Sequence, residues 1–159
     1  MAKLMTLKEF MIWLENTPDI ITEIEIKAKG VAPPIFRTID GSPAADRCIV
    51  FSGVREYIDE LLHTAASGIP TGLRLGANIR RLTQDLKSEL PRQGFYEVGL
   101  NVDYLIGNDI SWLLDNGIQV FSNLGDFPGG WHDICTSAVA GFKSNYTAAF
   151  LKWYMDYST

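Results

Sequence analysis

The chain has 159 residues, of which 47% are hydrophobic and 21% charged, and its formal net charge is −5. This composition excludes a disordered chain, and no apolar run approaches the roughly 20 residues that span a bilayer. The negative net charge argues against a general nucleic-acid coat.

The N-terminal segment predicts a helix followed by a strand. Thr6 and Glu9 have the spacing of a capping box, and apolar residues then recur at helical intervals, which predicts a helix over 7–16. Apolar and charged residues alternate over 22–29, which is typical of a half-buried strand with a charged outer face.

The middle of the chain predicts a loop, a strand and two helices. Prolines and glycines over 30–46 favour a loop, with a short strand at 35–39. The apolar run 47–51 predicts a buried strand, and an apolar stripe between Gly53 and Gly68 predicts a helix. Leucines at four-three spacing predict a second helix over 76–90.

The C-terminal part begins with the strongest strand pattern of the chain. Alternation over 96–106 predicts a long strand, followed by a short helix at 110–114 and a strand at 118–122. Segment 123–131 is a loop rich in glycine. The apolar spacing of 135–157 favours a helix, although its many aromatic residues leave a final strand as the alternative.

These elements predict one α+β domain over residues 1–159, in which a mixed or antiparallel sheet packs against several helices. No linker, repeat or low-complexity segment divides the chain.

One group of residues is a candidate for catalysis. His132 and Cys135 are three positions apart and follow the glycine-rich loop, so they are candidates for a histidine-assisted thiolate, with Asp133 or Asp109 to orient the histidine. With Cys48 and His63 the chain has two cysteines and two histidines, but their spacing is not that of a zinc module. We therefore expect neither a metal nor a cofactor.

A second set of residues is a candidate for binding. Arg80, Arg81 and Lys87 lie in a locally basic segment, for which a solvated helix face is the leading interpretation. Phe127 and Trp131 stand among the glycines of the loop 123–131 and are candidate anchors for a ligand or another protein.

The sequence from Asp19 to Lys27 resembles the Asp, then Glu-x-Lys pattern of metal-dependent nucleases. An extended chain would place Asp19 and Glu25 about 20 Å apart, too far for one metal ion. A charged outer face of the strand explains Glu25 and Lys27 without a metal.

With no motif that names a reaction, we expect a non-catalytic interaction or assembly protein that binds another protein or copies of itself. A helix that precedes strands such as 46–50 resembles small phage head-tail or tail proteins, and an inhibitor or immunity protein is a related reading. Two cysteines and no export signal indicate a cytoplasmic location, or the virion if the protein is viral. The alternative is a small cytosolic enzyme that uses Cys135 and His132.

Overall fold

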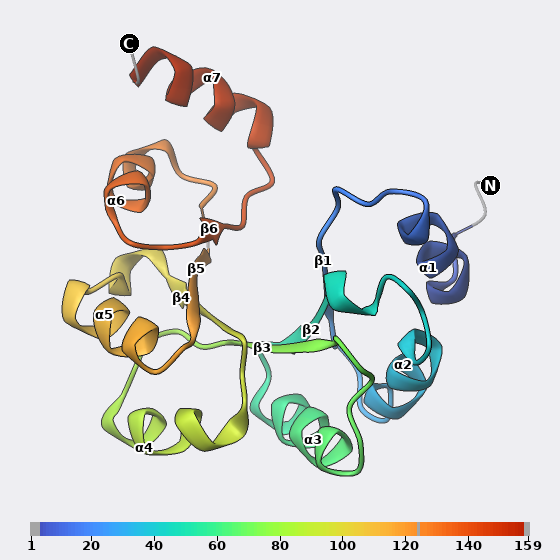
Figure 1. Ribbon diagram of the computed structural model, residues 1–159. Coiled ribbons are helices and arrows are strands. Elements are labelled where there is room, and N and C mark those ends of the chain that lie inside the picture. The colour runs from blue at the N-terminus through green and yellow to red at the C-terminus, as the bar shows by residue number, and fades with distance from the viewer. Residues whose placement is uncertain (1–3, 124, 158–159) are drawn as a thin grey trace. The chain divides into compact units, whose positions relative to one another are not determined.

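A computed structural model describes residues 4–123 and 125–157 (Figure 1). The chain divides into two compact units, Met1–Ala77 and Asn78–Thr159, which we refer to as unit 1 and unit 2. The boundary falls between two neighbouring residues of one strand, and a single domain over 1–159 stays a prediction.

The strands of unit 1 are parallel. They are β1 (Thr22–Glu25), β2 (Cys48–Ser52) and β3 (Arg74–Asn78), and β2 pairs with each of the other two. Every residue of β2 is buried, as expected of a central parallel strand that is covered on both faces.

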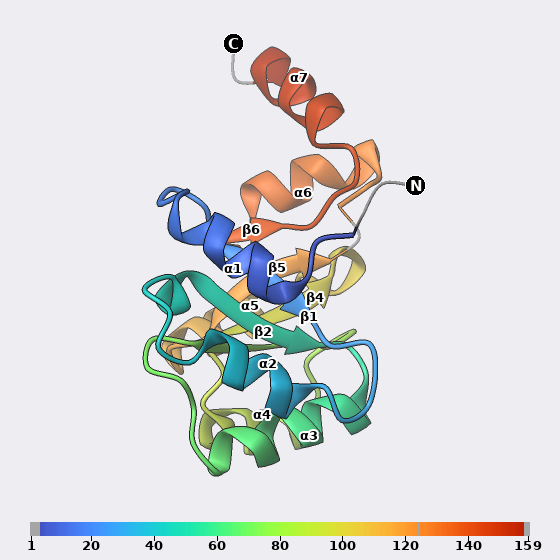
Figure 2. The same cartoon turned by 90° about the vertical axis from the view of Figure 1, so that its right-hand side faces the viewer.

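Helices follow or precede each of these strands. They are α1 (Leu7–Glu15), α2 (Ala32–Ile39) and α3 (Arg55–Ala66), with a 3-10 turn at Ala45–Arg47. The capping box of α1 is confirmed, because the Thr6 amide donates to the Glu9 carboxylate at 2.8 Å and the Glu9 amide donates to Thr6 Oγ1 at 3.3 Å. Helix α3 packs against β2, and α2 lies beside α3 (Figure 2).

Unit 2 repeats the alternation of strand and helix. Its strands β4 (Glu97–Asn101), β5 (Gln119–Asn123) and β6 (Gly141–Phe142) are parallel, with β5 between the other two. Its helices are α4 (Gln84–Gln93), α5 (Gly107–Asp115), α6 (Trp131–Thr136) and α7 (Thr147–Tyr157), with 3-10 turns at Val102–Tyr104 and Pro128–Gly130. Helix α5 packs against β5.

An aromatic cluster joins α6 to α7. The Trp131 side chain is 3% exposed, and its Nε1 donates to the Gly125 carbonyl at 2.7 Å. Its ring lies 5.5 Å from that of Phe150 and 5.6 Å from that of Trp153. Aromatic packing therefore holds the last helix in place.

The prediction of an α+β domain with a mixed or antiparallel sheet is wrong, because the strand pairings among the described residues of unit 1 and of unit 2 are parallel. Two incorrect predictions of secondary structure concealed the repeated order of strand and helix. Segment 35–39, predicted as a strand, lies in α2, where Pro33 and Pro34 occupy the first helical turn, a position that tolerates proline. Segment 74–78 is a strand and not the start of a helix.

Two further predictions need smaller corrections. The long strand 96–106 is the five-residue β4 followed by a 3-10 turn, because Val102–Tyr104 leaves the sheet. The segment 135–157 is not one helix but holds the end of α6, the strand β6 and α7. The helix and strand predictions for 7–16, 47–51 and 118–122 are confirmed to within a few residues.

Among residues 4–123 and 125–157, no helix has both the length and the apolar character needed to cross a membrane.

Candidate functional site

The carboxyl ends of parallel strands are the places where a βα fold brings chemical groups together, because the loops that follow the strands lie at the same edge. In unit 1, Glu25 is the last residue of β1 and Ser52 the last of β2. In unit 2, Asn123 ends β5 and Lys143 directly follows β6. Polar side chains therefore stand at these strand ends in both units.

An ion pair marks the end of β1. Lys27 Nζ lies 3.0 Å from Glu25 Oε2, and the side chains are 77% and 39% exposed. Ile26, between them, is buried, and its amide donates to the Phe51 carbonyl at 2.8 Å. The buried Ile26 thus lies between two exposed side chains, and its backbone amide holds this segment to β2.

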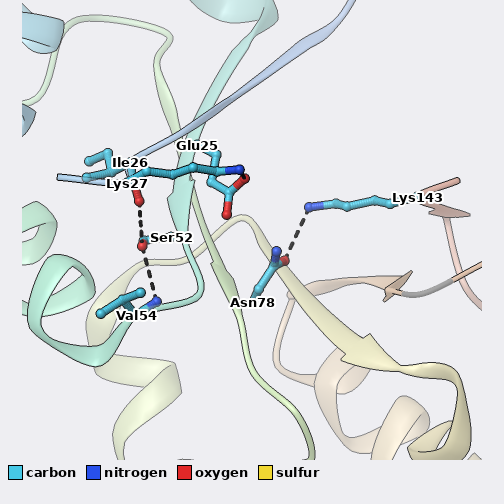
Figure 3. A network of polar contacts seen from close by, with 7 residues as sticks. All are labelled: Glu25, Ile26, Lys27, Ser52, Val54, Asn78 and Lys143. Carbon is cyan, nitrogen blue, oxygen red and sulfur yellow. Dashed lines mark hydrogen bonds and ion pairs between the residues drawn. The ribbon is translucent and has the colours of Figure 1, made fainter. Parts of the chain in front are cut away.

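Ser52 fixes the backbone beside this pair. The residue is fully buried, and its Oγ donates a hydrogen bond to the Ile26 carbonyl at 2.9 Å. The Val54 amide in turn donates to Ser52 Oγ at 3.2 Å (Figure 3). One hydroxyl thus links the segment after β1 to Val54, the N-cap of α3. Ser52 therefore positions the ion pair without contacting it.

Lys29 provides a contrast with Lys27. Its Nζ donates to Glu56 Oε1 at 2.8 Å, and both side chains are well exposed. The hydrogen bond to Glu56 raises the pKa of Lys29 above its ordinary value, with the charge of Glu56 as the next cause. Lys29 is thus committed to a surface pair away from Glu25.

In unit 2 two amide side chains converge over Gly99, in the middle of β4. A Cβ at position 99 would lie 2.3 Å from Asn78 Oδ1, 2.7 Å from Asn123 Oδ1 and 2.8 Å from Asn123 Nδ2. Lys143 Nζ donates to Asn78 Oδ1 at 3.2 Å (Figure 3). Glycine at position 99 therefore makes room for a cluster that we name the amide–lysine cluster: Asn78, Asn123 and Lys143.

The candidate catalytic residues from the sequence lie on the short helix α6. Within the part of the chain that the structure describes, no hydrogen bond joins His132 to Cys135, and the His132 ring lies 5.5 Å from that of Tyr157 in edge contact. Cys135 is exposed as a residue, but neighbouring atoms partly desolvate its sulfur, and this raises the pKa of the thiol. A raised pKa favours the neutral thiol over the nucleophilic thiolate.

Among the described residues, no group of three or more His, Cys, Asp or Glu side chains is placed to hold a metal ion.

The basic candidates line or adjoin a groove of about 430 Å³ between the segments that follow β3 and β4. Arg81 and Lys87 line it, and Lys87 Nζ is held 2.8 Å from Asp109 Oδ1. Arg80 lies over the ring of Tyr104, 5.5 Å from its centroid. A binding role for these basic residues stays a prediction.

The two aromatic candidates differ in burial. Phe127 is 69% exposed and lines a groove of about 510 Å³ together with Asp133 and Val102. Trp131 is buried in the aromatic cluster described above. Of the two, Phe127 presents its ring to solvent, and its binding role stays a prediction.

Sequence reasoning assigned Glu25 and Lys27 to a solvated face and did not select Asn78, Asn123 or Lys143. The signal that could have found them is a polar residue at the end of each buried strand. That signal depends on the correct assignment of β3, whose apolar residues fit a helical stripe equally well.

Solved structures of glycerophosphodiester phosphodiesterases have a similar fold. A provisionally assigned glycerophosphodiester phosphodiesterase from Galdieria sulphuraria superposes with a TM-score of 0.77 at 13% identity, over 92% of this chain and 62% of that chain. A glycerophosphodiester phosphodiesterase from Parabacteroides distasonis superposes with a TM-score of 0.71 at 14% identity, over 99% of this chain and 67% of that chain. The glycerophosphodiester phosphodiesterase from Agrobacterium tumefaciens superposes with a TM-score of 0.65 at 12% identity, over 91% of this chain and 59% of that chain. This chain thus spans 62% of the length of the first of these proteins.

No protein-family model and no curated protein matches the sequence. The structural neighbours contradict the prediction of a non-catalytic assembly, phage or immunity protein, and they agree better with the alternative of a small enzyme. At identities this low the likeness establishes the fold. The chain has parallel strands alternating with helices, in an arrangement that resembles the TIM-like fold of the glycerophosphodiester phosphodiesterases.

Proposed function

We propose that this protein is an enzyme that hydrolyses phosphodiesters of the glycerophosphodiester type, with Glu25 and Lys27 in the reaction. The observation that carries the proposal is the Glu25–Lys27 pair at the carboxyl end of β1, with 3.0 Å between Nζ and Oε2. Enzymes with TIM-like folds place their chemistry at this end of the strands. Cys135 has no part in the proposal.

Hydrolysis of a phosphodiester requires both a base and a positive charge. The oxygen of water forms a new bond to phosphorus, the bond from phosphorus to one ester oxygen breaks, and the products are a phosphomonoester and an alcohol. Glu25 accepts the proton that water releases, and the departing alkoxide takes a proton from solvent. The Lys27 ammonium stabilises the charge that builds up on the phosphoryl oxygens.

The pair is arranged for these roles because its backbone is fixed and its side chains are open to a substrate. Ile26 and Ser52 are buried and hydrogen-bonded, whereas Lys27 and Glu25 are exposed. A substrate phosphate can therefore take the place of Glu25 as the partner of Lys27. The carboxylate is then released next to the attacking water.

The test compares two lysines that lie two positions apart and are both exposed. Hydrolysis of glycerophosphoethanolamine is followed by release of glycerol phosphate, with and without added Mg²⁺. Lys27→Ala is expected to lower kcat/KM by about 100-fold or more, the usual effect of losing one group that stabilises transition-state charge. Lys29→Ala is expected to change it less than about twofold, because Lys29 pairs with Glu56.

A second variant, Glu25→Gln, keeps the shape of the side chain and removes the base. We expect it to lower kcat, because an amide cannot accept the proton that water releases. The proposal fails if the wild-type protein releases no glycerol phosphate, or if Lys27→Ala and Lys29→Ala have equal effects.

We also propose that the protein is cytoplasmic. We further propose that it binds another protein or further copies of this chain. Both cysteines are outside disulfides, which supports a reducing compartment. The exposed side chains of Phe127, of Tyr146 just before α7 and of Met155 on α7 support a contact surface. Size measurement in solution and affinity capture test the contacts.

A further inference from the structure

The amide–lysine cluster of unit 2 lies in space that only glycine leaves open. Gly99 does not have a positive φ, so its backbone conformation would accept any residue. A side chain there would instead collide with the amides of Asn78 and Asn123, whose nearest atoms lie 2.3 Å and 2.7 Å from the position of a Cβ. Glycine is thus needed at position 99 for the room it leaves to the two amides.

The hydrogen bonding of the cluster is incomplete in a specific way. Asn78 Oδ1 accepts from Lys143 Nζ at 3.2 Å. Asn123 Oδ1 is buried, and no group among residues 4–123 and 125–157 donates a hydrogen bond to it. A buried acceptor without a donor is unfavourable, so Asn123 Oδ1 calls for a donor that the described residues do not supply.

The chemistry of the missing partner follows from the groups that are present. A carbonyl oxygen such as Asn123 Oδ1 requires an O–H or N–H donor. The amide nitrogens of asparagine donate to hydroxyl or phosphate oxygens, and the adjacent Lys143 ammonium favours a ligand with negative charge. A group that both donates through hydroxyls and carries an anionic phosphate satisfies all three residues.

We propose that Asn78, Asn123 and Lys143 form a binding site for a polyol phosphate within unit 2. Asn123 Oδ1 accepts a hydrogen bond from a hydroxyl group of the ligand, and the Lys143 ammonium contacts the phosphate. This inference rests on the proposed function for the identity of the polyol, which is glycerol. Within unit 2 these residues select for the hydroxyl groups of the polyol phosphate.

The experiment measures binding and not turnover, so that it stands apart from the test of hydrolysis. Calorimetric titrations use glycerol 3-phosphate and n-propyl phosphate, which share three carbons and a phosphate but differ in the hydroxyls. The wild-type protein is expected to bind glycerol 3-phosphate at least about tenfold more tightly than n-propyl phosphate. This ratio of dissociation constants corresponds to roughly one net hydrogen bond.

The variants separate the roles of the three residues. Asn123→Ala is expected to weaken glycerol 3-phosphate binding by about tenfold and to leave n-propyl phosphate unchanged, whereas Lys143→Ala weakens both. Gly99→Ala, which displaces the amides without removing them, is expected to reproduce the effect of Asn123→Ala. Circular dichroism melting verifies that each variant is folded.

Asn116→Ala is the matched control. Its Nδ2 donates to the Trp112 carbonyl at the end of α5, and the C-terminus of a helix in a βα unit lies at the edge opposite the strand carboxyl ends. The inference is overturned if the wild type binds both ligands equally or not at all, or if Asn123→Ala weakens both alike. Hydroxyl-selective binding without hydrolysis would overturn the proposed reaction and support the binding site.

Discussion

At the scale of single residues, the two cysteines have the same chemistry but different surroundings. Cys48 is completely buried in β2, and its Sγ donates to the Ala44 carbonyl at 3.4 Å, whereas Cys135 is exposed on α6. Burial of sulfur raises the pKa of both thiols above the ordinary value of 9.0. Neither is therefore activated as a nucleophile at neutral pH.

This difference predicts the course of alkylation by iodoacetamide. In the folded protein we expect Cys135 to react slowly at pH 7 and faster as the pH rises toward and above 9.0, because only the thiolate reacts. Cys48 is expected to react only after unfolding. Peptide mass mapping distinguishes the sites, and Cys135→Ala serves as the control. Rapid reaction of Cys135 at pH 7 would contradict its raised pKa and restore the thiol as a candidate nucleophile.

The raised pKa of Cys48 also has a consequence for stability. Its folded-state pKa lies above its unfolded value, so the folded protein binds more protons at alkaline pH. The contribution of the neutral thiol is fully present below the unfolded pKa and is lost as the pH rises through the folded pKa.

At the scale of elements, a carboxylate connects the loop after β5 to the segment after β6. Asp126 accepts hydrogen bonds from the Asn145 backbone amide at 2.6 Å and from Asn145 Nδ2 at 2.8 Å. The side-chain hydrogen bond from Asn145 is the main cause that lowers the pKa of Asp126 below 3.8, followed by the backbone hydrogen bond. This contact therefore holds the two connections together most firmly when Asp126 is ionised.

We predict that Asn145→Ala raises the pKa of Asp126 toward 3.8, as measured by NMR titration of the carboxyl group. Because the folded pKa is lowered, the contact stabilises the fold above the unfolded pKa, and this contribution is lost as the pH falls through the folded pKa. Asn116→Ala is the control, since Asn116 bonds within α5. An unchanged titration of Asp126 in Asn145→Ala would exclude the Asn145 side chain as the main cause of the shift, since alanine keeps the backbone amide.

At the scale of the whole molecule, the boundary between the units falls inside β3, between Ala77 and Asn78. A linker of polar, glycine-rich residues is the usual boundary of domains that fold separately, and this boundary lacks one. We therefore expect the chain to unfold in one cooperative transition, as a single domain does.

Leu61→Ala tests this expectation. Leu61 is fully buried in α3 of unit 1, and its truncation is expected to cost about 2–5 kcal/mol of unfolding free energy. In a Trp13→Phe background, tryptophan fluorescence during urea unfolding reports unit 2 alone, because the other tryptophans lie there. Leu61→Ala should then shift the transition of unit 2, while Ile12→Ala, at an exposed position of α1, should shift it little. An unshifted transition would mean that the units unfold independently.

The sequence by itself determined the features that depend on near neighbours in the chain. The capping of α1 by Thr6, the buried strand β2 and the strand β5 follow from patterns a few residues long. It failed where a short segment fits two periodicities, as in β3, whose Leu75 also continues the leucine stripe of the next helix. Burial between helices on a parallel sheet decided that segment, and local propensity did not.

Only the tertiary structure decided the direction of the strands and the composition of the sites. Strand direction depends on the connections between strands, and a connection taken for a strand, as at 35–39, conceals the parallel order. The amide–lysine cluster joins Asn78, Asn123 and Lys143 over Gly99, positions that are far apart in the sequence. Such a group acquires its chemistry from proximity alone, and proximity between distant residues is what folding creates.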